Sequence, residues 1–148
     1  MSIDLSIIWF VIIVFATLMY IVMDGFDLGI GILFPFTRNA QDRDVMVNSV
    51  APVWDGNETW LVLGGAGLFG AFPLAYAVII DALTIPLSLM LVGLIFRGVA
   101  FEFRFNATPS HRPFWDSAFM GGSILATFCQ GVVVGAVING FEVTRSEE

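Results

Sequence analysis

The chain has 148 residues, of which 57% are hydrophobic and 13% are charged, and its mean hydropathy is +0.87. Soluble domains contain about 45–50% apolar and about 25% charged residues, so this composition excludes a water-soluble globule and indicates an integral membrane protein. A single Cys excludes an internal disulfide scaffold, 15 Phe and 4 Trp exclude disorder, and the absence of Lys argues against a nucleic-acid partner.

Long uncharged runs predict an all-α membrane bundle of about four transmembrane helices. We expect these helices at residues 5–36, 57–75, 77–103 and 115–141, within one membrane domain that covers residues 1–148. Between the second and third helices, a turn around residues 71–76 is as plausible as one at Asp81. The first run is interpreted as a retained helix because no Arg precedes it and no small-residue cleavage site follows it. The runs are continuously apolar rather than alternating, which argues against a barrel.

The arginines predict the orientation in the membrane. The loops after the first and third helices must lie on the same side, and most of the arginines lie in these loops or at a helix end beside them: Arg38, Arg43, Arg97, Arg104 and Arg112. Asp4 and Asp81 fall on the opposite side. The positive-inside rule therefore predicts that the arginine-rich loops are cytoplasmic and that the N-terminus lies outside.

Three charged residues fall within or beside the apolar runs. Asp24 and Asp27 are three residues apart, so both carboxylates lie on one helix face. They could hold a proton, bind a cation, pair with Arg97, cap the next segment or pair with loop arginines. Arg97 follows a long apolar run and needs a carboxylate partner, for which Asp24, Asp27 and Asp55 are candidates. Arg104 is expected to extend to the lipid headgroups.

A second acidic cluster lies where the second helix is expected to begin. Asp55 and Glu58 suit a helix N-terminus, where Asp55 could be the N-cap residue and Trp54 and Trp60 could be interface anchors. An acid at the cytoplasmic rim could equally be a point of proton uptake. Both readings stay open at this level.

Other motifs carry less chemistry. The segment GAGLFG at residues 65–70 matches a dinucleotide-binding pattern, but no strand precedes it, so we interpret it as a helix-packing face, like the pairs Gly25/Gly29 and Gly131/Gly135. His111 lies in a loop with no methionine paired to it, and no cluster of metal ligands is present, so no haem or metal site is expected on this chain. Cys129 is expected to be a core thiol.

Three motifs together resemble a known family. These are DGFDLG at residues 24–29, NSVAPVWDGN at residues 48–57 followed by Trp60, and FRGVAFEFR at residues 96–104. In this order they resemble subunit II of the bacterial cytochrome bd-type quinol oxidases, including the cyanide-insensitive branch. The family's subunits have eight helices, so the resemblance implies that this chain corresponds to the N-terminal half of one.

The resemblance implies a function for the complex. Such oxidases are multi-pass complexes of the bacterial inner membrane that oxidise quinol, reduce oxygen to water and generate a proton gradient. Haems b and d and the quinol-oxidation site belong to subunit I, against which subunit II packs in the lipid bilayer. Some members also hold a structural quinone in subunit II, whose position these motifs do not give.

The resemblance also implies roles for individual residues. Asp55 matches an acid on a proton route from the cytoplasm, and Trp60 matches a residue near an oxygen-access channel. Arg97 and Glu102 match polar positions at the end of the third helix, and some relatives have Asp in place of Glu102. We expect Asp55, Glu102, Asp24 and Asp27 to serve the proton pathway and Arg97 to form a structural ion pair.

One alternative is half of a proton-coupled transporter, in which Asp24, Asp27 and Arg97 would form a gated ion pair. Transporters place such charges near the midplane of the bilayer, whereas these charges cluster toward one face. A purely structural assembly partner is a third reading, and it predicts that neutralising the acids changes nothing.

Overall fold

The computed structural model describes residues 4–140, and this range contains helices and no strand. The α-helices are α1 (Leu5–Leu33), α2 (Ala40–Val50), α3 (Trp54–Ala71), α4 (Pro73–Ala82), α5 (Thr84–Arg104) and α6 (Arg112–Asn139), and a short 3-10 helix, η1, covers Phe34–Phe36. The predicted all-α fold class is confirmed. The number of helices differs from the expected one, for local reasons given below.

Helix α1 has clear start and stop signals. The side chain of Asp4 is the N-cap and accepts a hydrogen bond from the backbone N–H of Ser6 at 3.0 Å. Pro35 then occupies the first turn of η1, which tightens the end of the long helix, and Thr37 leaves it in an extended conformation.

The predicted second and third helices, 57–75 and 77–103, are wrong in their boundaries. The chain bends at Phe72, directly before Pro73, and again at Leu83, so the two expected spans become α3, α4 and α5. A proline disfavours the helical conformation at the residue before it, and it fits well at the first position of a new helix. The fourth helix also begins earlier than expected, at Arg112, with Pro113 in its first turn.

Helix α2 lies in a segment that the sequence predicted only as a loop. Asn39 caps its start by accepting a hydrogen bond from the backbone N–H of Gln41 at 3.0 Å. Its apolar residues Val47 and Val50 are buried. They pack in a core cluster whose other buried members are Phe34, Ala100, Phe101 and Phe119.

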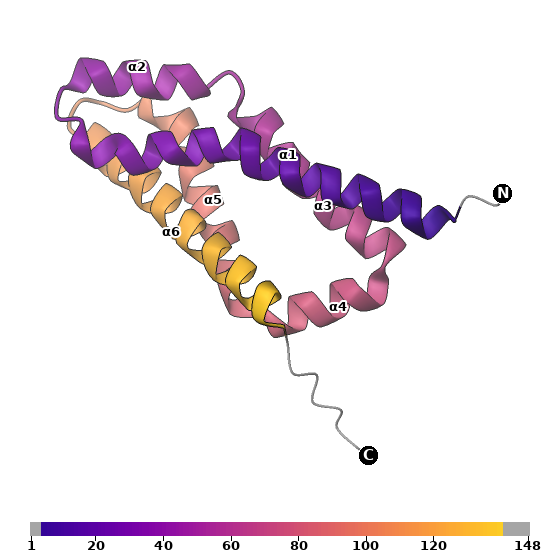
Figure 1. The fold of residues 1–148 in the computed structure, drawn as a ribbon. Coiled ribbons are helices and arrows are strands. Elements are labelled where there is room, and N and C mark those ends of the chain that lie inside the picture. The colour runs from indigo at the N-terminus through magenta and orange to yellow at the C-terminus, as the bar shows by residue number, and fades with distance from the viewer. Residues whose placement is uncertain (1–3, 141–148) are drawn as a thin grey trace.

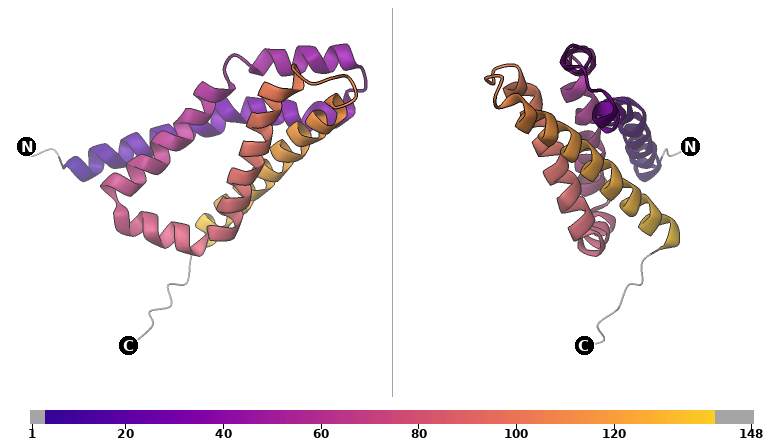
Figure 2. Two further views of the ribbon diagram at one scale, coloured as in Figure 1. Left: turned by 180° about the vertical axis from the view of Figure 1, so that it is seen from behind. Right: turned by 90° about the vertical axis from the view of Figure 1, so that its left-hand side faces the viewer.

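The helices are arranged as two splayed pairs. Helix α1 packs along α3 and α5 packs along α6, while α4 bridges the far ends of α3 and α5 (Figure 1). The view from behind shows the same arrangement, with α2 lying across the end where the pairs meet (Figure 2). The α5–α6 crossing is very close, since a Cβ atom built on Gly93 would lie 2.7 Å from the carbonyl oxygen of Gly122.

Within residues 4–140, three helices are long and apolar enough to cross a membrane by length and composition: α1 with η1, α5 and α6. The remaining expected span, residues 57–75, corresponds to α3, which begins with acidic residues and is followed by the short apolar helix α4. Most of the long apolar side chains on α1 are exposed, which suits contact with lipid or with other apolar helices. The molecule is an all-α membrane bundle.

Candidate functional site

A buried ion pair joins α1 to α5. Arg97 donates from Nη2 to Oδ1 of Asp24 at 2.8 Å, and both side chains are 0% exposed. Of the three carboxylates that the sequence left open as partners of Arg97, the structure pairs it with Asp24. The guanidinium group also lies 5.9 Å from the ring centre of Phe101. A charge so completely removed from water is expensive unless it is paired, so this contact fixes how α1 and α5 meet.

Glu58 is a third charged member of this site, and sequence reasoning gave it no role beyond the helix start. Its Oε2 atom lies 3.5 Å from the same Nη2 atom of Arg97, and its side chain is 25% exposed. Glu58 is one helical turn after Asp55, so it faces in nearly the same direction but deeper along α3. That three-residue spacing was the available signal, and the sequence alone could not tell which acid reaches Arg97.

Asp27 occupies the same buried face of α1 but has a different partner. Its Oδ2 atom accepts a hydrogen bond from Nδ2 of Asn57 at 3.0 Å, and Asn57 also donates to the carbonyl oxygen of Met23 at 3.3 Å. Asn57 is buried on α3. It therefore ties the second carboxyl group of α1 to α3, while Asp24 binds α5.

The cluster of Asp24, Asp27, Glu58 and Arg97 has more acid than base. The cluster contains three carboxyl groups and one guanidinium group, so full ionisation would leave an excess of two negative charges at a site where only Glu58 is partly exposed. Within residues 4–140, Oδ2 of Asp24, Oδ1 of Asp27, and Nε and Nη1 of Arg97 are buried without a hydrogen-bond partner. Such a site can lower its free energy by holding protons or water, which is suitable chemistry for a proton relay.

Asp55 and Glu102 lie on the surface rather than in the cluster. Asp55 is exposed in the first turn of α3, where Val53 is the N-cap residue and makes no side-chain capping bond. The alternative that Asp55 caps this helix is therefore wrong. Glu102 is exposed on α5.

A shallow surface groove of about 370 Å³ has both the exposed acid of α5 and one member of the cluster in its lining. It runs between α3 and α5, and both Glu58 and Glu102 line it. The other lining residues are mainly apolar: Trp54, Leu94, Ile95, Gly98, Val99 and Phe103. The half-buried Glu58 therefore borders this groove and also lies beside Arg97.

Trp60 lies on the opposite side of α3 from this groove, next to α1. Its ring packs edge-on against Phe15 with centroids 5.7 Å apart. It lines two small, mostly apolar cavities of about 310 Å³ and 230 Å³, the second of which also contacts Tyr20. Tyr20 donates its hydroxyl to Oε1 of Gln130 on α6 at 3.0 Å.

A second ionic network closes the end of the bundle near α2, and the sequence did not predict it. Arg104 donates to Asp116 at 2.5 Å and to Asp44 at 2.6 Å, while Arg43 donates to Asp116 at 3.3 Å. Arg104 is only 2% exposed, so the expectation that it extends to the lipid headgroups is wrong. Asp44 and Asp116 hold it inside because an arginine within reach of two carboxylates gains more from them than from solvent.

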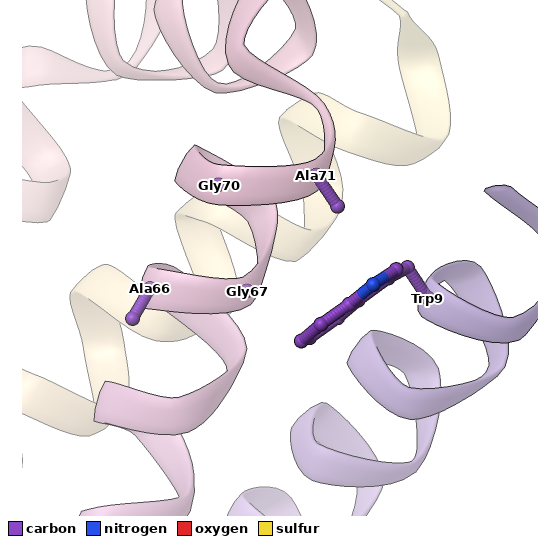
Figure 3. Close-up of a pocket in the computed structure, with 5 residues that line it drawn as sticks. All are labelled: Trp9, Ala66, Gly67, Gly70 and Ala71. Carbon is purple, nitrogen blue, oxygen red and sulfur yellow. The ribbon is translucent and has the colours of Figure 1, made fainter. Parts of the chain in front are cut away.

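The glycine motif at residues 65–70 lies inside α3, as expected for a packing face. The indole ring of Trp9 on α1 lies against the side of α3 formed by Ala66, Gly67, Gly70 and Ala71, around a cavity of about 260 Å³ (Figure 3). In contrast, a Cβ atom built on Gly25, Gly29, Gly131 or Gly135 would meet no described atom within 4 Å. Their predicted packing partners are therefore not found among residues 4–140.

Among residues 4–140, the side chains of the types that ligate haem lie in different surroundings. His111 is exposed, and its Nδ1 atom lies 2.7 Å from Oγ1 of Thr108. Met90 and Cys129 are buried in an apolar cluster with Leu28, Leu94 and Ala126. In the part of the chain that the structure describes, no group of three or more His, Cys, Asp or Glu could hold a metal ion.

Comparison with known proteins places these features in a family. The model of the family described as cytochrome bd terminal oxidase subunit II matches residues 5–147. The chain belongs to this family. It is 36% identical over 138 residues to cytochrome bd-I ubiquinol oxidase subunit 2 of Escherichia coli strain K12, which covers 92% of this chain and 36% of that protein.

Relatives in other bacteria match to a similar extent. The chain is 35% identical over 138 residues to a probable cytochrome oxidase subunit 2 of Haemophilus influenzae, covering 92% of this chain and 36% of that protein. It is 34% identical over 139 residues to cytochrome bd ubiquinol oxidase subunit 2 of Bacillus subtilis, covering 91% of this chain and 40% of that protein. The chain thus spans less than half the length of these relatives. Its apolar helices and its family indicate a multi-pass protein of the inner membrane.

Proposed function

We propose that this chain is a membrane subunit of a bd-type terminal oxidase that couples quinol oxidation to the reduction of oxygen to water. Its partner is a haem-bearing subunit I, which holds haems b and d, and this chain supplies scaffolding together with proton and oxygen access. The relatives' names, which specify ubiquinol oxidase subunits, support this assignment. Whether a structural quinone binds, and whether residues 1–148 form half of an eight-helix subunit, stay predictions.

The observation that carries the proton-access role is the buried cluster of Asp24, Asp27, Glu58 and Arg97. Oxygen reduction consumes protons, and a subunit other than the haem-bearing one can still contribute by conducting protons through the apolar region. Carboxyl groups can do this because they bind and release a proton with little change in geometry. Asp55, one turn before Glu58 on α3, and Glu102, which lines the groove with Glu58, are both exposed and are the proposed points of uptake.

Oxygen access is proposed for the cavities around Trp60. Oxygen is small and apolar, so a chain of apolar cavities offers it a favourable route between helices. Trp60 lines two such cavities, one on the surface of α3 and one between α1, α3 and α6. Replacing this ring would change the size and shape of both.

The alternative function, half of a proton-coupled transporter, fits the buried Arg97–Asp24 pair but not the family match. Measuring quinol-driven oxygen uptake separates the two. The full-length subunit is expressed together with its haem-bearing partner, and a transporter predicts no oxygen uptake that depends on this chain.

The residue test uses the variants Asp55→Asn and Glu102→Gln in that complex. We expect each to slow oxygen uptake while leaving the haem spectra intact, because proton delivery rather than assembly is impaired. If both acids serve one route, the double variant slows uptake by less than the product of the single effects. Asp81→Asn, an exposed acid on α4, is the matched control. Unchanged turnover in Asp55→Asn would remove that residue from the mechanism.

A further inference from the structure

We infer that Glu58 is the mobile proton carrier that links the groove between α3 and α5 to the buried acids of α1. This inference rests on the proposed proton-access function and names the residue that performs the transfer. Glu58 contacts both the exposed groove and the buried ion pair, since it lines the groove with Glu102 and also faces Arg97. The other carboxyl groups lie in only one of them: Asp24 and Asp27 are fully buried, and Asp55 and Glu102 are exposed.

The contacts of Glu58 are looser than those of Asp24. Asp24 accepts a hydrogen bond from Nη2 of Arg97 at 2.8 Å, whereas Oε2 of Glu58 lies 3.5 Å from the same nitrogen and accepts no hydrogen bond within residues 4–140. A carboxylate at 3.5 Å retains Coulomb attraction without the directional bond. Its longer side chain can therefore turn into the groove at little cost, while Asp24 stays in place.

Proton transfer through Glu58 costs little free energy because Arg97 keeps a negatively charged partner throughout. A proton from water in the groove binds to the carboxylate of Glu58, which becomes neutral and loses its attraction to Arg97. The neutral acid then gives this proton to the carboxylate of Asp24, whose Oδ2 atom is buried and unpartnered among the described residues. Glu58 is again an anion and pairs with Arg97. At each stage the guanidinium group faces at least one carboxylate, so no unpaired positive charge is left buried.

The surrounding groups set the direction of the path. Asp55 lies one turn earlier on α3 and Glu102 lies on α5, both on the exposed side. Asp27, held by Asn57, lies one turn beyond Asp24 on α1. Tyr20 is one turn on the other side of Asp24, with its hydroxyl bonded to Gln130 of α6. The path therefore runs from the groove to Glu58, then to Asp24 and Asp27.

The decisive experiment separates proton uptake from electron transfer. The complex of the full-length subunit with its haem-bearing partner is reconstituted in vesicles, and proton uptake during a single turnover is followed with a pH-sensitive dye while haem absorbance is recorded. Glu58→Gln keeps the size and polarity of the side chain but cannot carry a proton. We expect it to slow proton uptake about tenfold or more and to change the solvent deuterium isotope effect, with haem spectra intact.

Two control variants distinguish the loss of an acidic group from a general effect of substitution. Glu58→Asp should retain a large part of the rate because it keeps an acid, and Asp81→Asn should behave as the unmodified complex. Proton uptake in Glu58→Gln at the normal rate overturns the inference. If Asp55→Asn is slow but Glu58→Gln is normal, the proposed function survives without Glu58; if neither is slow, both fail.

The inference can still be tested if the Glu58→Gln complex fails to assemble. In that case Glu58→Asp is compared with the unmodified complex by infrared difference spectroscopy during turnover. If Glu58 carries the proton, the carbonyl band of its protonated carboxyl group moves when the side chain is shortened. A spectrum in which every carboxyl band stays in place overturns the inference.

Discussion

At the scale of single residues, the site depends on one arginine shared by two acids. Arg97 bonds to Asp24 and faces Glu58, and the three side chains come from α5, α1 and α3. Burying these charges costs several kcal/mol per ion, and mutual attraction offsets that cost only while the partners stay together. The pair therefore specifies how the helices meet, and it is weak support for stability by itself.

Removing one member of this pair should be much worse than removing both. Arg97→Gln leaves Asp24 buried without its partner, and we expect a loss of about 3–5 kcal/mol in stability. Adding Asp24→Asn to that variant should restore part of the loss, so the two effects are less than additive. Unfolding of the purified full-length complex, followed by haem absorbance and size-exclusion chromatography, measures the effect. Strictly additive losses would contradict the pairing.

At the scale of helices, two kinds of contact hold the elements together. Close backbone approach joins α5 to α6 at Gly93 and Gly122, and a core of aromatic rings joins η1, α5 and α6 through Phe34, Phe101 and Phe119. The ionic network around Arg104 then fastens α2 onto the end of this core. In lipid the hydrophobic effect does not drive helices together, so close packing and polar contacts stabilise their association instead.

The glycine crossing gives a direct test of this packing. Gly93→Ala would place a Cβ atom 2.7 Å from the carbonyl oxygen of Gly122, which is backbone and cannot move aside easily. We expect a loss of about 1–3 kcal/mol, despite the higher helix propensity of Ala. Gly131→Ala on α6 is the control, since its Cβ atom would meet no described atom within 4 Å. The thermal midpoint of the detergent-solubilised chain should fall for the first variant only. Equal midpoints for the two variants would argue against the close crossing.

At the scale of the whole molecule, charge is unevenly distributed between the two ends. Arg43, Arg104 and Arg112 gather with Asp44 and Asp116 where α2, α5 and α6 meet, and α4 closes the opposite end (Figure 1). The loops after α1 and α5 therefore lie at the same end of the bundle. This agrees with the expectation that the loops after the first and third predicted helices share one side of the membrane. The positive-inside rule predicts that this end faces the cytoplasm.

Cysteine labelling tests this orientation. In a Cys129→Ser background, Ser6→Cys places an exposed thiol near the start of α1 and Gln41→Cys places one on α2. With the N-terminus outside, a membrane-impermeant maleimide labels the first variant in intact spheroplasts and the second only after permeabilisation. The reverse pattern would invert the topology and would put Asp55 on the wrong side for proton uptake.

The sequence by itself determined the class of this protein and many of its functional candidates. Continuous apolar runs leave helices as the structure that satisfies the backbone in lipid, and charged residues beside those runs had to find partners. Helix boundaries were less accessible, because the sequence left a turn around residues 71–76 and one at Asp81 as alternatives, whereas the structure interrupts the helices at both Phe72 and Leu83. Helix α2 was missed since its few apolar residues face a core that only the other helices create.

Only the tertiary structure decided which charges meet. From the sequence, Asp24, Asp27 and Asp55 were all possible ion-pair partners of Arg97. Which of them forms the ion pair depends on the rotation of α1 and α3 about their axes. Asp55 and Glu58 are three residues apart on one helix, so the sequence alone places them on nearly the same face. In the structure Asp55 is exposed, whereas Glu58 reaches the buried pair. Helix rotation is set by packing against neighbours, and that information is distributed over the whole chain.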